Sequence, residues 1–548
     1  MKQLCRWKKT MSAVLAAVLV LTSLSMSFAD SQAVDAAIRR AAAYMTSTNK
    51  SPELGTVGGD WTVLGLSRSS SSVPEGYYEI YYRSVAKQIK EKKGVLHPKK
   101  YTEYSRLILA LTALGRDPSD VEGYDLMEKM SDYDKVVWQG LNGPIWALIA
   151  VDSHKYEIPK VSKDGRQNSR ELLIQEILNN QLDDGGFAFG AKSAKDAGDP
   201  DMTGMAIQAL APYRGQPKVK KALDKAVNFL ASIQNEDGGY STWGAKTSES
   251  TAQVLVALTA MGIDPEKDKR FVKNSHSVVD NILSYQLPSG GFMHVKAGDK
   301  NNGGGEAGRE DGMATDQALY ALTSYSRLLK GKTRLYDMTD VKFKKPKAEK
   351  KQPVSETPSK KTEGGGFKDV SGHRFKAEII YLAQKGIVSG TTPTTYEPSK
   401  KMTRAEFATI LVKALSLKSS GKMKFKDVSG TSWYYDKVLA ANNAGLIRGS
   451  TAEKFLPNDP ITVQEAAVIL ANAAKYRGFD ISMNEGSTRD MLAQFEDYTT
   501  SDKWARPYLA YCLKAGILSQ DEIKLRPKNI VSRGEMAKMV YQLIHMEK

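Results

Sequence analysis

The chain has 548 residues, enough to form several hydrophobic cores, and its 78 lysines and arginines exceed its 62 aspartates and glutamates by 16. This excess of positive charge suggests an acidic polymer as partner. The two cysteines, and the lack of a His/Cys cluster or an H-E-x-x-H motif, argue against a transition metal, a cofactor or a disulfide framework.

Residues 1–29 have the pattern of a secretory signal peptide. A basic start is followed by an apolar run from Ala13 to Leu24 and by small residues up to Ala29. The run is shorter than the ~20 residues that cross a bilayer, so we expect cleavage after Ala29, export, and no stable membrane insertion. An exported protein is a poor partner for nucleic acid. Cleavage also removes Cys5 and leaves Cys512, which cannot form an internal disulfide.

Residues 30–335 show helical periodicity and almost no alternating strand pattern. Apolar residues at helical spacing predict twelve helices, near residues 31–47, 60–68, 77–92, 102–115, 122–131, 137–152, 168–180, 202–214, 217–233, 249–262, 271–286 and 312–330. In several pairs the second helix is apolar on most sides, which favours burial, and the first carries more charge. We therefore expect six helical hairpins arranged as an inner and an outer layer.

A turn motif recurs in this region. The pattern Q-x-x-(D/S)-G-G-(F/Y) begins at Gln181, Gln234 and Gln286, at intervals of 53 and 52 residues. Paired glycines permit tight or left-handed turns where a helix ends, and the aspartate can accept hydrogen bonds from backbone amides. We expect the aromatic residue to pack between helices and the glutamine to tie one turn to its neighbour.

This motif resembles the repeat of the prenyltransferase and squalene–hopene cyclase superfamily. The resemblance covers residues 30–335 and implies an α6/α6 toroid within an all-α protein. A fold does not fix the chemistry, and the motifs of its known activities are missing. For the D-x-D-D acid of squalene–hopene cyclases, the nearest match, residues 199–202, lacks the final aspartate. The zinc set of prenyltransferases needs a cysteine, and the cysteine of the mature chain lies outside the toroid. The C-G-E-Q motif of thioester proteins is absent. We assign no catalytic residue.

Side chains where the turns enter the inner helices should reach the rim of the toroid's central cavity. The candidates for contact with an unknown toroid ligand are Asp60, Trp61, Tyr104, Trp146, Asp201, Trp243, Gln253 and Asp316. Helix capping and core packing are the alternative explanation for most of them.

Residues 336–366 have the composition of an extended linker. From Val341 to Glu363 the chain carries eight lysines, three glutamates and three prolines, which cannot bury a core.

Three repeats follow the linker. FKDV, FKDV and FEDY begin at Phe367, Phe425 and Phe495, 58 and 70 residues apart, and the expected units are 367–415, 425–475 and 495–545. Each contains a helix start of the form (S/T)-x-x-E, the capping box, in which hydroxyl and carboxylate satisfy helix amides. One unit cannot bury its apolar face alone, so we expect the three to pack together.

An arginine follows the capping residue in two repeats, at Arg404 and Arg533. The cap does not need it, and a cation is disfavoured at a helix start. We therefore expect exposed guanidinium groups that grip a carboxylate or phosphate. The alternative is a solvated surface arginine.

The F-x-D-V start, the G-(I/L)-x-x-G turn and the (I/M)-T-R-A-E helix start resemble the S-layer homology (SLH) domain. The resemblance implies a pseudo-threefold helical module. It also implies non-covalent binding of an anionic secondary cell wall polysaccharide, often through a pyruvylated sugar. The residues it assigns to polymer binding are Asp369, Gly390, Arg404, Asp427, Trp433, Gly449, Asp497, Trp504 and Arg533. The chain departs from the pattern at Arg374 (for tryptophan), Val463 (for arginine) and Gln520 (for glycine), so the second arginine site is incomplete.

The sequence thus predicts a secreted protein of the cell wall or S-layer surface that displays an α/α toroid with a binding or structural role. One alternative is a surface-tethered lyase or cyclase, acting on a polysaccharide or terpenoid in the toroid cavity. Another is a toroid that carries a small ligand such as a corrinoid.

Overall fold

The computed structural model describes residues 31–343 and 367–546, apart from residues 56, 57, 163, 192, 300, 302–305, 484 and 521. The expected signal peptide and most of the expected linker lie outside these residues. The chain forms two compact units, which divide after Pro346, and each is described by itself. Within the described residues, we find no helix that is both long enough and apolar enough to cross a membrane.

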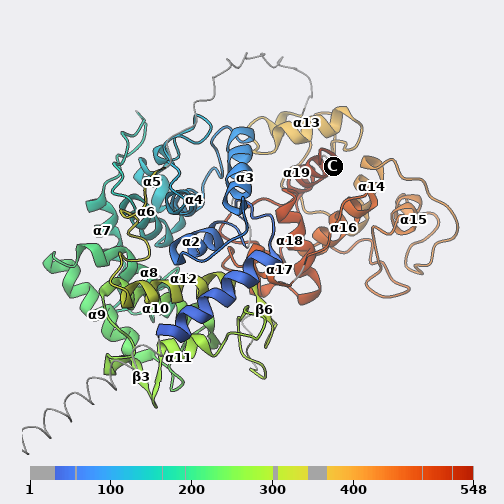
Figure 1. Ribbon diagram of the computed structural model, residues 1–548. Helices are drawn as coiled ribbons and strands as arrows, with labels where there is room; N and C mark the ends of the chain where they lie inside the picture. The colour runs from blue at the N-terminus through green and yellow to red at the C-terminus, as the bar shows by residue number, and fades with distance from the viewer. Residues whose placement is uncertain are drawn as a thin grey trace, which may run out of the picture. The chain divides into compact units, whose positions relative to one another are not determined.

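Six helices of the first unit form a closed inner ring. They are α2 (Asp60–Ser69), α4 (Thr102–Ala113), α6 (Asn142–Asp152), α8 (Pro200–Leu210), α10 (Ser248–Met261) and α12 (Gly312–Leu329). Each packs against the next, and α12 returns to α2 (Figure 1). The outer layer consists of a helix over residues 31–48, α3 (Tyr77–Glu91), α5 (Tyr133–Val136), α7 (Arg170–Asn179), α9 (Pro217–Ile233) and α11 (Val278–Leu283). The α6/α6 toroid expected from the sequence is confirmed.

Burial separates the two layers as their composition predicts. Nearly the whole of α10 is buried, from Ser248 to Thr259. In contrast, α9 buries one stripe at helical spacing, which includes Val219, Leu223 and Leu230, and presents its lysines to solvent.

The glutamine of each turn motif joins neighbouring hairpins. In each turn the glutamine Nε2 donates to the carbonyl of the first glycine of its own glycine pair, and also to a carbonyl of a neighbouring outer segment of the ring. The three glutamines are Gln181, Gln234 and Gln286. Gln286 reaches the Ala37 carbonyl at 2.9 Å, which ties the last turn to the first helix and helps to close the ring. The first glycine of each pair has a left-handed φ, for example +100° at Gly290, which a residue with a Cβ rarely adopts.

Short antiparallel hairpins precede the inner helices α10 and α12 and the outer helix α11. The antiparallel pairs are β1 (Tyr240–Thr242) with β2 (Ala245–Thr247), β3 (Val272–Lys273) with β4 (His276–Ser277), and β5 (Phe292–Met293) with β6 (Glu310–Asp311). In two of them the motif aromatic pairs with the N-cap residue of the next inner helix, Tyr240 with Thr247 and Phe292 with Asp311. The turns therefore fix where those inner helices begin.

Two of the predicted helices are wrong over much of their length. Residues 122–131 form a turn and the 3-10 helix η1 (Met127–Met130), because Gly123 is left-handed and Asp125 accepts from the Met127 amide. Residues 271–286 begin with the β3–β4 hairpin, because Asn274 and Ser275 both adopt the positive φ of a two-residue turn.

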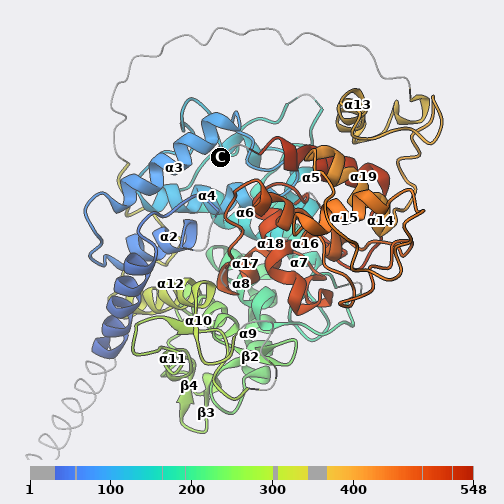
Figure 2. The ribbon, with the colours of Figure 1, turned by 90° about the vertical axis from the view of Figure 1, so that its right-hand side faces the viewer.

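Over the residues described in the second unit, the chain forms three helical pairs and one additional helix. Its helices are α13 (Lys376–Gln384), α14 (Arg404–Ala414), α15 (Tyr435–Asn443), α16 (Val463–Tyr476), α17 (Glu485–Leu492), α18 (Arg506–Lys514) and α19 (Arg533–Ile544). Helix α17 lies in the stretch that makes the interval before the third repeat longer. Helices α14, α16 and α19 carry the capping boxes, and α19 packs against both α14 and α16 (Figure 2).

A triangle of backbone hydrogen bonds links the three repeats. The Met402 amide donates to the Val531 carbonyl (3.0 Å), the Val531 amide to the Ile461 carbonyl (2.9 Å), and the Ile461 amide to the Met402 carbonyl (3.1 Å). These residues precede the three capping boxes. The closed triangle gives the unit the pseudo-threefold arrangement that the sequence predicts.

Candidate functional site

Aromatic side chains fill the interior of the toroid ring. The Trp61 ring lies 5.1 Å from the Trp146 ring and 5.8 Å from the Tyr320 ring, measured between centroids. Gln253 donates to the Tyr320 hydroxyl at 2.7 Å. Two of the eight cavity candidates, Trp61 and Trp146, therefore contact each other, and a third, Gln253, is joined to Trp61 through Tyr320.

The other cavity candidates have different surroundings. Asp60 accepts from Arg106 (2.6 Å) and from the Tyr81 hydroxyl (2.6 Å). The buried Tyr104 hydroxyl donates to the His97 carbonyl, which accounts for it structurally. Trp243 is 76% exposed in the β1–β2 turn.

Two buried carboxyl groups of the inner helices have strongly raised pKa values. Burial, reinforced by the nearby Asp199, raises the pKa of Asp201 to about 7. Its Oδ2 accepts from Thr242 at 2.8 Å, and its Oδ1 has no hydrogen-bond partner among the described residues. Burial also raises the pKa of Asp316 to about 7, although hydrogen bonds from Thr62 and the Gly58 amide oppose the shift. Both groups can hold a proton near neutral pH.

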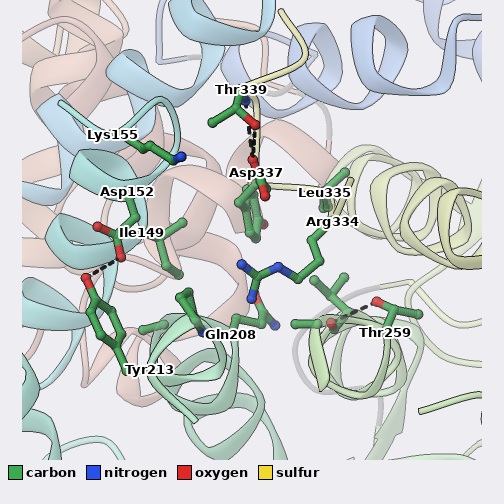
Figure 3. A pocket seen from close by; sticks show the side chains of 15 residues that line it. Ile149, Asp152, Lys155, Gln208, Tyr213, Thr259, Arg334, Leu335, Asp337 and Thr339 are labelled. Atoms are coloured by element: carbon green, nitrogen blue, oxygen red, sulfur yellow. Dashed lines mark hydrogen bonds between the residues drawn. The ribbon is translucent and has the colours of Figure 1, made fainter. Parts of the chain in front are cut away.

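A cavity of about 230 Å³ lies at the C-terminal ends of inner helices (Figure 3). Its walls come from α6, α8 and α10 and from residues 333–341, which follow α12 and are called the strap below. None of the eight cavity candidates lines it, because they were sought where the turns enter the inner helices. The sequence placed most of the strap in the linker, yet Met338 is buried in the toroid core.

In the second unit, the aspartate of each F-x-D start acts as a clasp. Asp427 accepts from the amides of Phe455 (2.9 Å) and Leu456 (2.8 Å), 28 and 29 residues further on. Asp369 and Asp497 make the same pair of contacts in their own repeats. Each clasp holds a residue at positive φ, for example Leu456 at +60°. These aspartates therefore have a structural function, whether or not they also contact polymer.

The second turn glycine of the first two repeats has a steric cause. A Cβ on Gly390 or Gly449 would collide with backbone carbonyl oxygens and with the ring of Phe367 or Phe425. These two glycines allow the loop to fold back onto the phenylalanine that starts the repeat.

Arg404 does not have the exposed guanidinium group that we expected. It is 7% exposed, its Nε donates to the Phe455 carbonyl (2.9 Å), and its Nη1 pairs with Glu465 (2.9 Å). Both partners belong to the second repeat. Arg404 thus joins the first two repeats, and a carboxylate already compensates its charge.

Arg533 occupies the equivalent place between the third repeat and the first, but is only half-buried. Its Nε donates to the Tyr396 carbonyl (2.8 Å) and its Nη2 to the Ser389 carbonyl (2.7 Å). Its guanidinium group lies over the Tyr396 ring. No carboxylate pairs with Arg533 among the described residues, so it can bind an added anion.

The junction between the second and third repeats has no arginine at the position equivalent to Arg404 and Arg533. Val463 takes that position, and the next residue, Gln464, donates to Asp502 at 2.7 Å. Lys528 also donates to Asp502, at 2.8 Å. The three junctions are therefore chemically different, although the backbone repeats.

Two tryptophans are displayed on the surface of the unit. Trp433 is 66% exposed and Trp504 is 53% exposed, so neither indole packs as a wedge between helices. Each directly precedes the N-cap residue of its helix, α15 or α18. In the first repeat this place is taken by Arg374, which pairs with Glu522 at 3.1 Å.

Comparison with known protein families identifies both units. Residues 366–408, 424–467 and 494–537 match the S-layer homology domain, and residues 177–335 match the squalene-hopene cyclase C-terminal domain. The chain therefore carries a squalene–hopene cyclase-like toroid followed by three SLH domains.

Curated relatives share about a third of the chain. A surface-layer 125 kDa protein of Lysinibacillus sphaericus is 33% identical over 175 residues, 31% of this chain and 14% of its own length. The exoglucanase XynX of Acetivibrio thermocellus is 34% identical over 180 residues, 32% of this chain and 16% of its own length. An S-layer protein of Bacillus thuringiensis subsp. finitimus is 31% identical over 181 residues, 32% of this chain and 21% of its own length. The SLH domains and these S-layer relatives indicate a location at the cell surface.

Among solved structures, a type II terpene cyclase from Scytonema aligns with 55% of this chain and 99% of its own. It is 12% identical with a TM-score of 0.34, and a likeness of this size says nothing about activity.

Proposed function

We propose that this protein is anchored non-covalently to an anionic secondary cell wall polysaccharide through its SLH unit and displays the toroid at the surface. The observation that carries the proposal is the set of three SLH domains, one junction of which presents an arginine without a carboxylate partner. The net charge of +16 favours an acidic polymer.

We assign the principal binding contact to the junction between the third and first repeats. A pyruvyl ketal on a sugar carries a carboxylate, and the free N–H groups of Arg533 can donate to it. Arg404 is less suited because Glu465 already takes its charge. The exposed indoles of Trp433 and Trp504 offer flat apolar faces on which sugar rings can stack.

Calorimetric titration of the full chain with polymer released from sacculi tests this assignment. Arg533→Gln should weaken binding by about tenfold or more, since a hydrogen bond to a charged group is worth roughly 1.5–3 kcal/mol. Lys413→Gln, which removes an exposed charge from α14, is the matched control and should change little. Mild acid hydrolysis of the ketals should abolish the difference between Arg533→Gln and the unmodified chain.

Equal affinities of Arg533→Gln and Lys413→Gln would refute the assigned junction. Full binding after loss of the ketals would refute the pyruvyl carboxylate as the group that Arg533 binds. Attachment of the protein to another anionic group of the polymer would remain compatible with that result.

A second candidate function, favoured by Asp201, is enzymatic. A buried carboxyl group with a pKa near 7 and one unpartnered oxygen can act as a general acid. The enzymatic function would be supported if the full chain turned over cell-wall glycans or isoprenoids and Asp201→Asn did not. Absence of turnover on both substrate classes by the full chain would count against it.

A further inference from the structure

The cavity beneath the strap has mainly apolar walls and a few polar groups. Its apolar lining includes Ile149, Ala209, Pro212, Val256 and Leu335. A small concave site with this balance is typical of sites for small molecules, and its volume of about 230 Å³ is too small for a polymer.

Two polar atoms in the lining residues have no protein partner. Gln208 is 5% exposed, and its Nε2 donates to the carbonyl and to the side-chain oxygen of Gln253, which fixes the orientation of the amide. Its Oε1 then has no hydrogen-bond donor among the described residues, and the buried hydroxyl of Tyr336 has no partner there either. Leaving such groups unsatisfied costs roughly 1–3 kcal/mol each, which a ligand with matching groups would recover.

A cation faces the same space. The guanidinium group of Arg334 points into the cavity between Ile149 and Gln208 (Figure 3), and no carboxylate pairs with it among the described residues. Two carboxylates line the same space. Asp152 is paired with Arg170 (2.7 Å) and accepts from Tyr213 (2.8 Å), whereas Asp337 accepts from the Thr339 hydroxyl (2.7 Å).

The strap is held firmly, so the cavity is a permanent feature of the toroid. Arg68 is buried and donates to the carbonyls of Leu335 (2.9 Å) and Asp337 (2.9 Å). Arg68 and Arg327 both pair with Asp340, at 2.8 and 2.7 Å. The strap backbone that carries Arg334 and Tyr336 is therefore held in place before a ligand arrives, which reduces the entropy lost on binding.

We propose that this cavity binds a small organic acid with an apolar body and a hydroxyl group. The acid group pairs with Arg334, the hydroxyl donates to Gln208 Oε1, the Tyr336 hydroxyl supplies a further hydrogen bond, and the body lies against the apolar walls. Two cations, Arg334 and Lys155, face one lining carboxylate without an ion pair among the described residues, Asp337, so the lining disfavours cationic ligands. This site is independent of wall attachment, and it uses the ends of the inner helices opposite to Asp201.

Calorimetry and thermal shift of the full chain in solution, without cell wall, test the proposal. The probes share one body: 4-hydroxyphenylacetate carries both polar groups, phenylacetate lacks the hydroxyl, and tyramine replaces the acid by an amine. We expect 4-hydroxyphenylacetate to bind best, phenylacetate about tenfold more weakly, and tyramine not at all.

Three variants locate the site. Arg334→Gln should weaken 4-hydroxyphenylacetate about tenfold, whereas Lys332→Gln, an exposed charge next to the strap, should not. Tyr336→Phe should not lower the melting temperature of the ligand-free chain, because its hydroxyl has no partner among the described residues, yet it should reduce the ligand-induced shift. No binding at millimolar concentration, equal binding of all three probes, or equal loss in Arg334→Gln and Lys332→Gln would overturn the proposal. Since no sacculi are used, failure here leaves the anchoring function untouched.

Discussion

Asp427→Asn should destabilise the SLH unit without removing its capacity to bind polymer when folded. The Asp427 carboxylate accepts from two consecutive amides, those of Phe455 and Leu456, and holds Leu456 at a φ of +60°. Asparagine keeps one accepting oxygen but presents an NH₂ group to the second amide. One charge-assisted hydrogen bond is therefore lost, and a donor faces a donor.

The expected loss follows from this geometry. A hydrogen bond to a charged group contributes about 1.5–3 kcal/mol, and partial exposure of the clasp favours the lower half of that range, so we expect about 2 kcal/mol. For a unit of this size, 1 kcal/mol shifts the melting temperature by roughly 2–4 °C, which gives a decrease of about 4–8 °C.

The clasp also sets a pH dependence. The hydrogen bonds from Phe455 and Leu456 outweigh burial and lower the pKa of Asp427 below 3.8. A lowered folded-state pKa means that the clasp contributes its full stability above pH 3.8 and loses it as the pH falls through the folded value.

Scanning calorimetry of the full chain measures the effect. Asp436→Asn, on the exposed face of α15 in the same repeat, is the control that removes the same charge without a clasp. Equal melting temperatures for Asp427→Asn and Asp436→Asn would refute the structural assignment. So would an unchanged melting temperature with lost polymer binding.

Three further predictions concern stability. Gln286→Leu should cost about 1–3 kcal/mol in denaturant unfolding, because it strands carbonyl oxygens where the ring closes, whereas the exposed Gln175→Leu should be nearly neutral. The pKa of Asp201 is about 7 in the folded state against 3.8 for the free group, so the wild type loses stability as the pH rises between those values. Asp201→Asn should abolish that loss. Its free energy of unfolding should exceed that of the wild type by at most about 4 kcal/mol at pH 8, with no gain near pH 3. Gly449→Ala should unfold at lower temperature than Gly430→Ala, whose Cβ meets open space.

Features that depend on neighbours in sequence were predictable. The capping boxes join residues three apart, as at Thr403 and Glu406, and the structure confirms all three. The glycine turns and the linking role of the glutamines followed from one motif repeated at near-constant intervals. The inner and outer layers followed from the apolar second members of the six hairpins, and the toroid followed from the resemblance of the turn motif to the squalene–hopene cyclase superfamily.

Features that depend on distant pairs were not predictable from one sequence. The prediction that the Arg404 guanidinium is exposed was wrong because its partner Glu465 lies 61 residues away in the next repeat. The strap looked like linker because its anchors, Arg68 and Asp340, are 272 residues apart. The cavity was missed for the same reason: its walls come from three helices and the strap, and no local pattern marks Gln208 or Arg334.

Cosedimentation of the full chain with cell-wall sacculi tests the anchoring function most directly. The chain should sediment with native sacculi and stay in solution after the secondary polymer has been extracted, and added free polymer should release it. Sedimentation that is unchanged by extraction of the polymer, or no sedimentation with native sacculi, would contradict the account.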